Sequence, residues 1–323
     1  MCPIQRILVA IKDPTARPLP ALAKATQLAR ACDAGLELFH ALDSCVYLDM
    51  LGCSEDRALQ VERDESAEYL QQLEGTAARL RLHTENVTVA AESDYPAYEA
   101  IVRHAEAIGA DLIVAECHAG SHTAAALRQL VDWELVRSSP IPVLLVRLPQ
   151  PYHRPTILAA VDPSHAFGKP PQLDEDVLGL GGVLSNALRG ELHAVHAYLP
   201  RGAGELVWAT AAGLSAAARS ANQAKMRFDQ LLEGANIVPA RRHLIGGNPS
   251  AGVARLARRL RADIVVAGAM SRTGLQRLLM GNTAESLLNS LPCDLLVVKP
   301  AGFSSRIPTT TQGPRLVSVP PAW

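Results

Sequence analysis

The second half of the chain repeats the first half. Four segments return in the same order about 150 residues later, which is hard to obtain by chance. This period is far longer than the roughly 20–50 residues of a solenoid repeat, so each copy is predicted to be a domain in its own right. The four pairs of segments are 6–14 with 156–164, 35–41 with 190–197, 110–115 with 262–267, and 142–147 with 294–299.

Within each copy, short apolar segments alternate with longer amphipathic segments. This alternation predicts strands joined by helical, right-handed crossovers, and hence a parallel sheet covered on both faces. The predicted fold class is α/β, with two tandem copies of a five-stranded parallel-sheet, Rossmann-like domain. The predicted strands are 5–11, 35–41, 86–91, 111–116 and 142–147, then 155–161, 190–197, 240–245, 263–268 and 294–298. The predicted helices are 19–32, 55–82, 96–108 and 124–139, then 174–188, 205–234, 249–261 and 282–291. Helix 249–261 is predicted to start with Asn248 as its cap and Pro249 at its first position.

The predicted domains are 1–148 and 155–300, joined by a proline-rich segment. Beyond residue 300 the sequence is rich in Ser, Thr and Pro and poor in large apolar residues, so 301–323 is expected to be a disordered tail. Sheets of this kind bind ligands at the carboxyl ends of their strands, near the point where the strand order reverses. Asp13 and Asp162 both fall at such strand ends.

Composition bears on partners and location. Basic residues (31) and acidic residues (32) nearly balance, and aromatic residues make up 4% of the chain, so no nucleic-acid partner is expected. No stretch reaches the roughly 18 apolar residues of a membrane span, and the first segment does not have the pattern of a signal peptide, so no membrane association is expected. The six cysteines are scattered without a C-x-x-C pair, which indicates reduced thiols and a cytoplasmic protein.

The most informative motif for function follows the fourth predicted strand of the second copy. A loop from Gly268 to Gly274 leads after a short gap to Gly281 and a predicted helix. Main-chain N–H groups in such a loop and at a helix start can bind an anion, and a nucleotide phosphate is the usual one. The alternative is a tight turn followed by a helix cap, because Asn282 and Glu285 form a capping-box pattern.

The repeat and this loop together resemble the universal stress protein family in its tandem two-domain form, over about residues 4–299. Nucleotide-binding members of that family carry Gly, two residues, Gly, nine residues, Gly, and then Ser or Thr. Gly268 and Gly281 match the first and last glycines of this pattern, and 272–281 is very close to the family's usual sequence. The resemblance therefore implies an adenine nucleotide, ATP or AMP, bound in the second copy.

Two residues depart from the family pattern. Ser271 stands where the second glycine belongs, and Asn282 stands where Ser or Thr belongs, with Thr283 one place later. Serine does not share the backbone freedom of glycine, and its side chain narrows the approach of a phosphate. The amide of Asn282 can still donate hydrogen bonds, so the site is expected to be weakened and not abolished. The phosphate-loop residues implied by the resemblance are Gly268, Ser271, Gly274, Gly281, Asn282 and Thr283.

The resemblance also implies two contacts to the nucleoside. The family uses an acidic residue at the end of the first strand, which Asp162 matches in the second copy and Asp13 in the first. Val195, on the second strand of the second copy, would lie beside the adenine. The alternative for Asp162 is a structural turn, because Asp-Pro-Ser is common turn chemistry.

The first copy does not keep the glycine loop. Glu116, Ala119 and Gln129 stand opposite Gly268, Ser271 and Gly281, and Glu116 would repel a phosphate. Instead this copy has a histidine-containing loop and Asp132-Trp133, which resembles the E subgroup of the family. Cys117, His118 and His122 could ligate a metal ion, but three loosely spaced groups are not a zinc signature, so surface histidines and no metal are expected.

The leading functional hypothesis is a cytoplasmic stress-response protein whose second domain binds an adenine nucleotide as a sensor or regulator. The first alternative is a nucleotide-independent member that holds another small or lipid-like ligand, or that docks a protein partner. The second is a slow ATPase, although no general base is evident near the loop.

The closing strands 142–147 and 294–298 are strongly apolar and would each be an exposed sheet edge if left alone. Single-domain members of the family that the chain resembles commonly dimerise through their last strands. The resemblance therefore implies an intramolecular pseudo-dimer of the two domains, with further homodimerisation left open.

Overall fold

The computed structural model describes residues 3–42, 55–81, 86–94, 96–117, 133–164, 170, 172–200, 211–269, 290–305, 307–308 and 315–317. The chain forms two compact units. The first consists of Met1–Tyr152 together with Ser304–Trp323, and the second of His153–Phe303. The boundary between them lies in the proline-rich segment that separates the domains predicted from the sequence.

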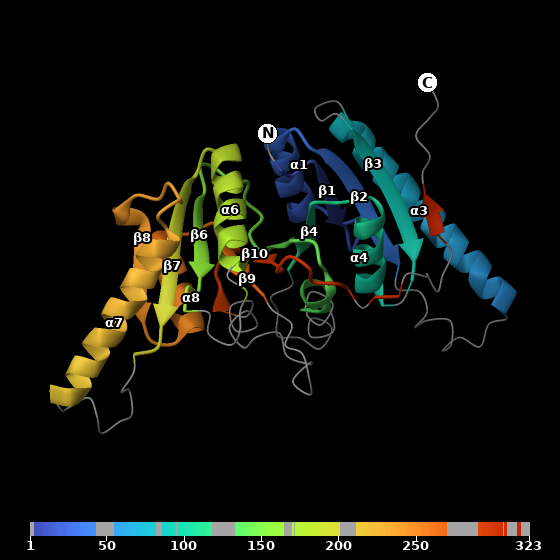
Figure 1. Ribbon diagram of the computed structural model, residues 1–323. Coiled ribbons are helices and arrows are strands. Elements are labelled where there is room, and N and C mark those ends of the chain that lie inside the picture. The colour runs from blue at the N-terminus through green and yellow to red at the C-terminus, as the bar shows by residue number, and fades with distance from the viewer. Residues whose placement is uncertain are drawn as a thin grey trace. The chain divides into compact units, whose positions relative to one another are not determined.

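The first unit is built on parallel strands with one antiparallel strand at an edge (Figure 1). Its elements are β1 (Arg6–Ala10), α1 (Pro20–Cys32), β2 (Gly35–Leu42), α3 (Glu55–Arg81), β3 (Val87–Ser93), α4 (Ala97–Ala107), β4 (Leu112–Glu116), β5 (Val143–Val146) and β11 (Arg315–Val317). The strand order is β11-β3-β2-β1-β4-β5, and all pairings among β1 to β5 are parallel.

The second unit repeats this plan (Figure 1). Its elements are β6 (Thr156–Val161), α6 (Gln172–Ala187), β7 (Glu191–Tyr198), α7 (Ala211–Leu231), the 3₁₀ turn η2 (Pro239–Arg241), β8 (Arg242–Gly246), α8 (Pro249–Leu260), β9 (Ile264–Gly268) and β10 (Asp294–Val298). The strand order is β10-β9-β6-β7-β8, again with parallel pairing throughout.

Continuous apolar runs form the central strands of both units. Ile7, Leu8 and Val9 of β1 are fully buried, as are Ile157 and Leu158 of β6. Strands buried on both faces read as uninterrupted apolar sequence, which is why periodicity in the sequence identifies them. The predicted α/β class with tandem parallel-sheet domains is confirmed. The predicted helices 124–139 and 282–291 fall largely outside the described residues.

Local signals at helix ends were also predictive. The side chain of Asn248 accepts a hydrogen bond from the N–H of Ala251 at 3.1 Å, and Pro249 occupies the first position of α8. The side chain thus satisfies one of the donors that a helix start leaves without an intrahelical acceptor. The predicted start of this helix is confirmed.

The structure shifts one part of the repeat by a residue. The N–H groups of Gly35 and Glu191 each donate to the residue that precedes the first strand of their unit, at 2.8 and 2.9 Å. The N–H groups of Ala34 and Gly190 each donate back to the preceding helix, at 2.9 and 2.7 Å. Gly190 therefore corresponds to Ala34 and not to Gly35. The sequence comparison paired the two glycines because they are identical residues one position apart, and the sequence does not record the main-chain hydrogen bonds.

The segment after residue 300 differs from the expected disordered tail at three residues. β11 pairs antiparallel with β3, so that Arg315 lies opposite Glu92 and Val317 lies opposite Ala90. Composition predicts disorder where a segment cannot bury enough apolar surface of its own. A strand added to an existing sheet edge does not need a core of its own, since main-chain hydrogen bonds to the edge hold it.

A buried acid–base pair ties β2 to α4 in the first unit. Oε1 of Glu37 lies 2.6 Å from Nε2 of His104, and the ring of His104 stacks on that of Phe39. Burial raises the pKa of the Glu37 carboxyl, but the hydrogen bond and charge of His104, with a further hydrogen bond from the hydroxyl of Thr88, outweigh it. The net pKa of Glu37 is below its ordinary value.

This pair predicts a pH dependence of stability. A carboxyl whose pKa is lower in the folded chain stabilises the fold above its unfolded pKa of about 4.3, and that contribution is lost as the pH falls through the folded value. We expect Glu37→Gln to lower the free energy of unfolding of the first unit by about 1–3 kcal/mol near pH 7, and by progressively less below about pH 4. Urea unfolding at a series of pH values measures this. A difference between wild type and variant that stays constant down to pH ~3 would contradict it.

Candidate functional site: the strand ends of β6 and β9

The order of strands in the second unit reverses between β6 and β9. The chain runs from β6 to β7 and β8 on one side, then returns to β9 on the other side of β6 (Figure 1). β6 and β9 pair in register, with Ala160 opposite Ala267. Their carboxyl ends therefore lie next to each other, at the place where open α/β sheets bind ligands.

Asp162 follows the last residue of β6 and is held in a fixed turn. Its Oδ1 accepts hydrogen bonds from the N–H and the hydroxyl of Ser164. Its own N–H donates to Oδ1 of Asp174, in the first turn of α6, at 2.9 Å. The side chain of Asp162 nevertheless keeps 32% of its surface exposed, so the carboxylate is oriented and accessible.

A buried histidine from β7 stands beside this carboxylate. Nδ1 of His196 lies 3.2 Å from the carbonyl oxygen of Val161 and 3.9 Å from Oδ1 of Asp162. A carbonyl oxygen only accepts hydrogen bonds, so Nδ1 must carry a proton that it donates to Val161. His196 thus joins the end of β7 to the end of β6 and supports the turn that carries Asp162.

Gly268 ends β9 and packs closely against α6. A Cβ atom at this position would lie 2.8 Å from both Cγ and Cδ2 of Leu173, closer than side chains normally approach. Leu173 is itself fully buried. Gly268 therefore has a packing role in addition to the proposed contact with phosphate. Neither Leu173 nor Asp174 was identified from the sequence, because the sequence of a helix start does not indicate which residues it will pack against.

The other predicted site residues are placed only in part. Val195 on β7 is 1% exposed and lies opposite Ala160 of β6 in the register. Leu192 packs against Gly181 of α6, and side chains alternate along a strand, so Val195 points to the opposite face of the sheet. Ser271, Gly274, Gly281, Asn282 and Thr283 lie outside the described residues.

The first unit builds the same turn. Oδ1 of Asp13 accepts hydrogen bonds from the hydroxyl and the N–H of Thr15, and these hold the pKa of Asp13 below its ordinary value. Nδ1 of His40 lies 2.7 Å from the carbonyl oxygen of Ile11, and burial lowers the pKa of this histidine. His40 and His196 lie at matching places in the repeated segments 35–41 and 190–197. In both units this histidine ties the second strand to the end of the first.

The two units differ at the end of the fourth strand. Glu116 lies opposite Val146 in the register of the first unit, as Gly268 lies opposite Val298 in the second. The Oε1 atom of Glu116 accepts from the N–H of Ala21, near the start of α1, at 3.5 Å. A carboxylate thus stands in the first unit where the second unit has no side chain.

Of the three residues considered and set aside as metal ligands in the first copy, the structure describes only Cys117, which is partly exposed. His118 and His122 lie outside the described residues. Among the residues that the structure does describe, no three His, Cys, Asp or Glu side chains are grouped as a metal site requires. In the same described ranges, no helix is long and apolar enough to cross a membrane.

Comparison with known proteins agrees with this architecture. A model of the universal stress protein family matches residues 3–147 and matches again at residues 154–299. The chain belongs to the universal stress protein family. It carries two universal stress protein domains in tandem, one in each unit.

The chain is similar to proteins named universal stress protein E. The universal stress protein E homolog of Haemophilus influenzae is 31% identical, over 53% of this chain and 56% of the relative, so the chain spans little more than half of that protein. Universal stress protein E of Escherichia coli K12 is 28% identical, over 65% of this chain and 67% of the relative. The functionally unknown protein PA1789 of Pseudomonas aeruginosa has a similar fold, with a TM-score of 0.70 at 24% identity, covering 92% of this chain and 93% of that one.

Proposed function

We propose that the protein is a cytoplasmic stress-response protein that binds one adenine nucleotide, ATP or AMP, in its second domain and acts as a sensor or regulator. One observation carries the proposal: Asp162 directly follows β6 and Gly268 is the last residue of the adjacent strand β9, at the point where the strand order reverses. Ligands of open α/β sheets bind at such points. Membership of the universal stress protein family supports a role in the stress response.

In this proposal each part of the nucleotide has its own contacts. The accessible carboxylate of Asp162 accepts hydrogen bonds from the nucleoside, and Val195 lies on the strand beside the adenine. The phosphates lie along the loop that begins at Gly268 and includes Ser271, Gly274, Gly281, Asn282 and Thr283. The main-chain N–H groups of this loop and of the helix predicted to follow it would supply the donors.

The first domain is not proposed as a second nucleotide site. The carboxylate of Glu116 occupies the position where Gly268 lies in the second domain. A negative charge there repels a phosphate, and in the sequence Gln129 stands opposite Gly281. One nucleotide per chain is therefore the expected stoichiometry.

Calorimetric titration with ATP, with AMP and GTP as comparisons, tests the proposal. We expect one site per chain and preference for the adenine nucleotides. Asp162→Asn should weaken binding by about tenfold or more, because it removes a charge-assisted hydrogen bond. The matched control is Asp13→Asn, which changes the same turn in the first domain and should leave the affinity unaltered. Two equivalent sites, or equal losses in the two variants, would contradict the proposal.

One observation favours a nucleotide-independent alternative. The close contact between Gly268 and Leu173 explains this glycine by packing alone. In that case the second domain holds another small or lipid-like ligand, or docks a protein partner, and titration with ATP produces no heat of binding. A slow ATPase remains a lesser candidate, and it predicts release of phosphate that depends on Asp162.

A further inference from the structure

The outer edge of β3 is covered in the first unit, whereas its counterpart in the second unit is not. Ala90, Ala91 and Glu92 of β3 have at most 1% of their surface exposed. β8 is the corresponding edge strand of the second unit, and its residues are half-buried or exposed. In the described part of the second unit, no strand pairs with the outer edge of β8. In the first unit, by contrast, β11 pairs with the outer edge of β3.

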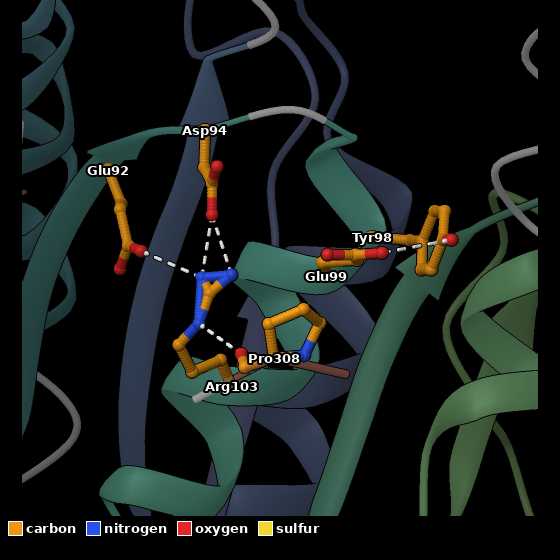
Figure 2. A network of polar contacts seen from close by, with 6 residues as sticks. All are labelled: Glu92, Asp94, Tyr98, Glu99, Arg103 and Pro308. Carbon is orange, nitrogen blue, oxygen red and sulfur yellow. Dashed lines mark hydrogen bonds and ion pairs between the residues drawn. The ribbon is translucent and has the colours of Figure 1, made fainter. Parts of the chain in front are cut away.

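A single arginine of α4 faces both β3 and the segment that returns to it. Nη1 and Nη2 of Arg103 each donate to Oδ2 of Asp94 at 2.6 Å, and Nη1 lies 3.5 Å from Oε1 of Glu92. Nε donates to the carbonyl oxygen of Pro308 at 3.2 Å. Figure 2 shows the guanidinium between the two carboxylates on one side and Pro308 on the other.

This arrangement fixes the direction of one hydrogen-bond donor. The side chain of Arg103 is 12% exposed, and those of Glu92 and Asp94 are 2% and 1% exposed. Because the carboxylates engage the two terminal nitrogens, the guanidinium plane is held and its Nε–H points at the incoming main chain. A main-chain carbonyl is present in every extended segment, so this donor recognises backbone and not a particular side chain.

We propose that the outer edge of β3, together with Arg103, is a binding site for an extended polypeptide segment that adds antiparallel to β3, and that residues 304–323 of this chain are its resident occupant. The site binds the main chain of the segment in two places. The edge of β3 pairs with residues 315–317, and Nε of Arg103 donates to the carbonyl oxygen of Pro308. Such strand addition gives affinity that tolerates changes of side-chain sequence. We expect the segment to be releasable, because its ladder with β3 comprises three residue pairs in the described part of the segment.

Covalent attachment keeps the segment in place despite the short ladder. A tethered segment is present at an effective concentration of about millimolar, so it excludes the same segment supplied from solution at micromolar concentration. The site therefore becomes available to a segment in trans only when the attached strand is disabled. This dependence distinguishes a strand-addition site from an arginine that only links α4 to β3.

The test uses the full chain with Leu316→Pro and Val317→Pro. In an antiparallel ladder alternate residues direct their N–H toward the partner, so two consecutive prolines remove at least one such donor whichever residue carries it. Hydrogen exchange followed by mass spectrometry should show β3 amides exchanging about tenfold faster in this variant, as expected from one or two lost hydrogen bonds. The amides of β8 serve as the internal control and should be unchanged.

A fluorescent peptide of residues 304–323 then tests the site directly. The peptide should bind the double-proline chain and restore the protection of β3, and it should not bind the wild type at the same concentration. A peptide with the same two prolines should bind neither chain. Arg103→Lys in the double-proline chain keeps a cation beside Asp94 but removes the Nε donor, so peptide affinity should fall about tenfold. Arg255→Lys, on the exposed face of α8, is the matched control and should have no effect.

Three results would overturn the proposal: unchanged exchange of β3 in the double-proline chain, peptide binding that is equal in the variant and the wild type, or no peptide binding to either. Intact far-ultraviolet circular dichroism of each variant confirms that the comparison is made between folded chains.

Discussion

Replacing Gly190 by alanine is expected to lower the free energy of unfolding of the second unit by about 3 kcal/mol. A Cβ atom at this position would overlap the carbonyl oxygen of Pro155 and would lie 2.9 Å from its Cδ. The same carbonyl accepts the N–H of Glu191 at 2.9 Å, where β7 begins beside β6. The contact involves main chain and a rigid ring, so it can be relieved only by moving the start of β6 away from β7.

The control for this change is Gly35→Ala in the first unit. Gly35 also stands at the start of a second strand, but its added Cβ would lie 3.7 Å from the nearest atoms, which is ordinary contact. We expect a change of at most about 1 kcal/mol, and a small gain is possible because alanine restricts the unfolded chain. Chemical unfolding of both variants measures the difference. Equal effects at Gly35 and Gly190 would show that the short distance to Pro155 relaxes at little cost.

The second large effect is expected at Arg103. Arg103→Leu removes the cation that lies against the buried carboxylates of Glu92 and Asp94. Removing one partner of a buried ion pair leaves charge in a poorly solvated place, and the loss is typically about 3–5 kcal/mol. We expect a loss of this size for the first unit at neutral pH, measured by urea unfolding.

Two comparisons show whether the loss comes from the carboxylates. Arg103→Leu combined with Asp94→Asn should recover part of the stability, because one of the buried charges is then absent. Arg255→Leu removes an exposed arginine of α8 and should change stability by no more than about 0.5 kcal/mol. A loss below about 1 kcal/mol for Arg103→Leu would mean that water reaches these carboxylates more freely than their burial indicates.

The sequence predicted most of the fold because the fold is encoded in local patterns. Runs such as Ile7 to Val9 and Ile264 to Val266 are apolar without interruption, and strands buried on both faces have that property. The repeat then fixed the number of domains. What the sequence did not predict was β11, because the three residues Arg315–Val317 become a strand only through pairing with β3, a partner more than 200 residues away in the chain.

The candidate site was predicted less completely, and for a physical reason. Asp162 and Gly268 were identified because each lies at the carboxyl end of a recognisable strand. Asp174 and Leu173 approach them from α6, and such approaches depend on tertiary packing that a sequence pattern does not record. His196 repeats His40 in the sequence, but its contact with Val161 depends on the pairing of β6 with β7, which the repeat alone does not specify.

The return of residues 304–323 to the first unit has a consequence for synthesis on the ribosome. The chain emerges from its N-terminus, so β1 to β5 are complete before any of the second unit has been made. The outer edge of β3 stays unpaired until residues 315–317 leave the exit tunnel, which happens after the whole second unit has been translated. During that interval the nascent first unit has an unpaired strand edge, and a chaperone or a neighbouring nascent chain can pair with it.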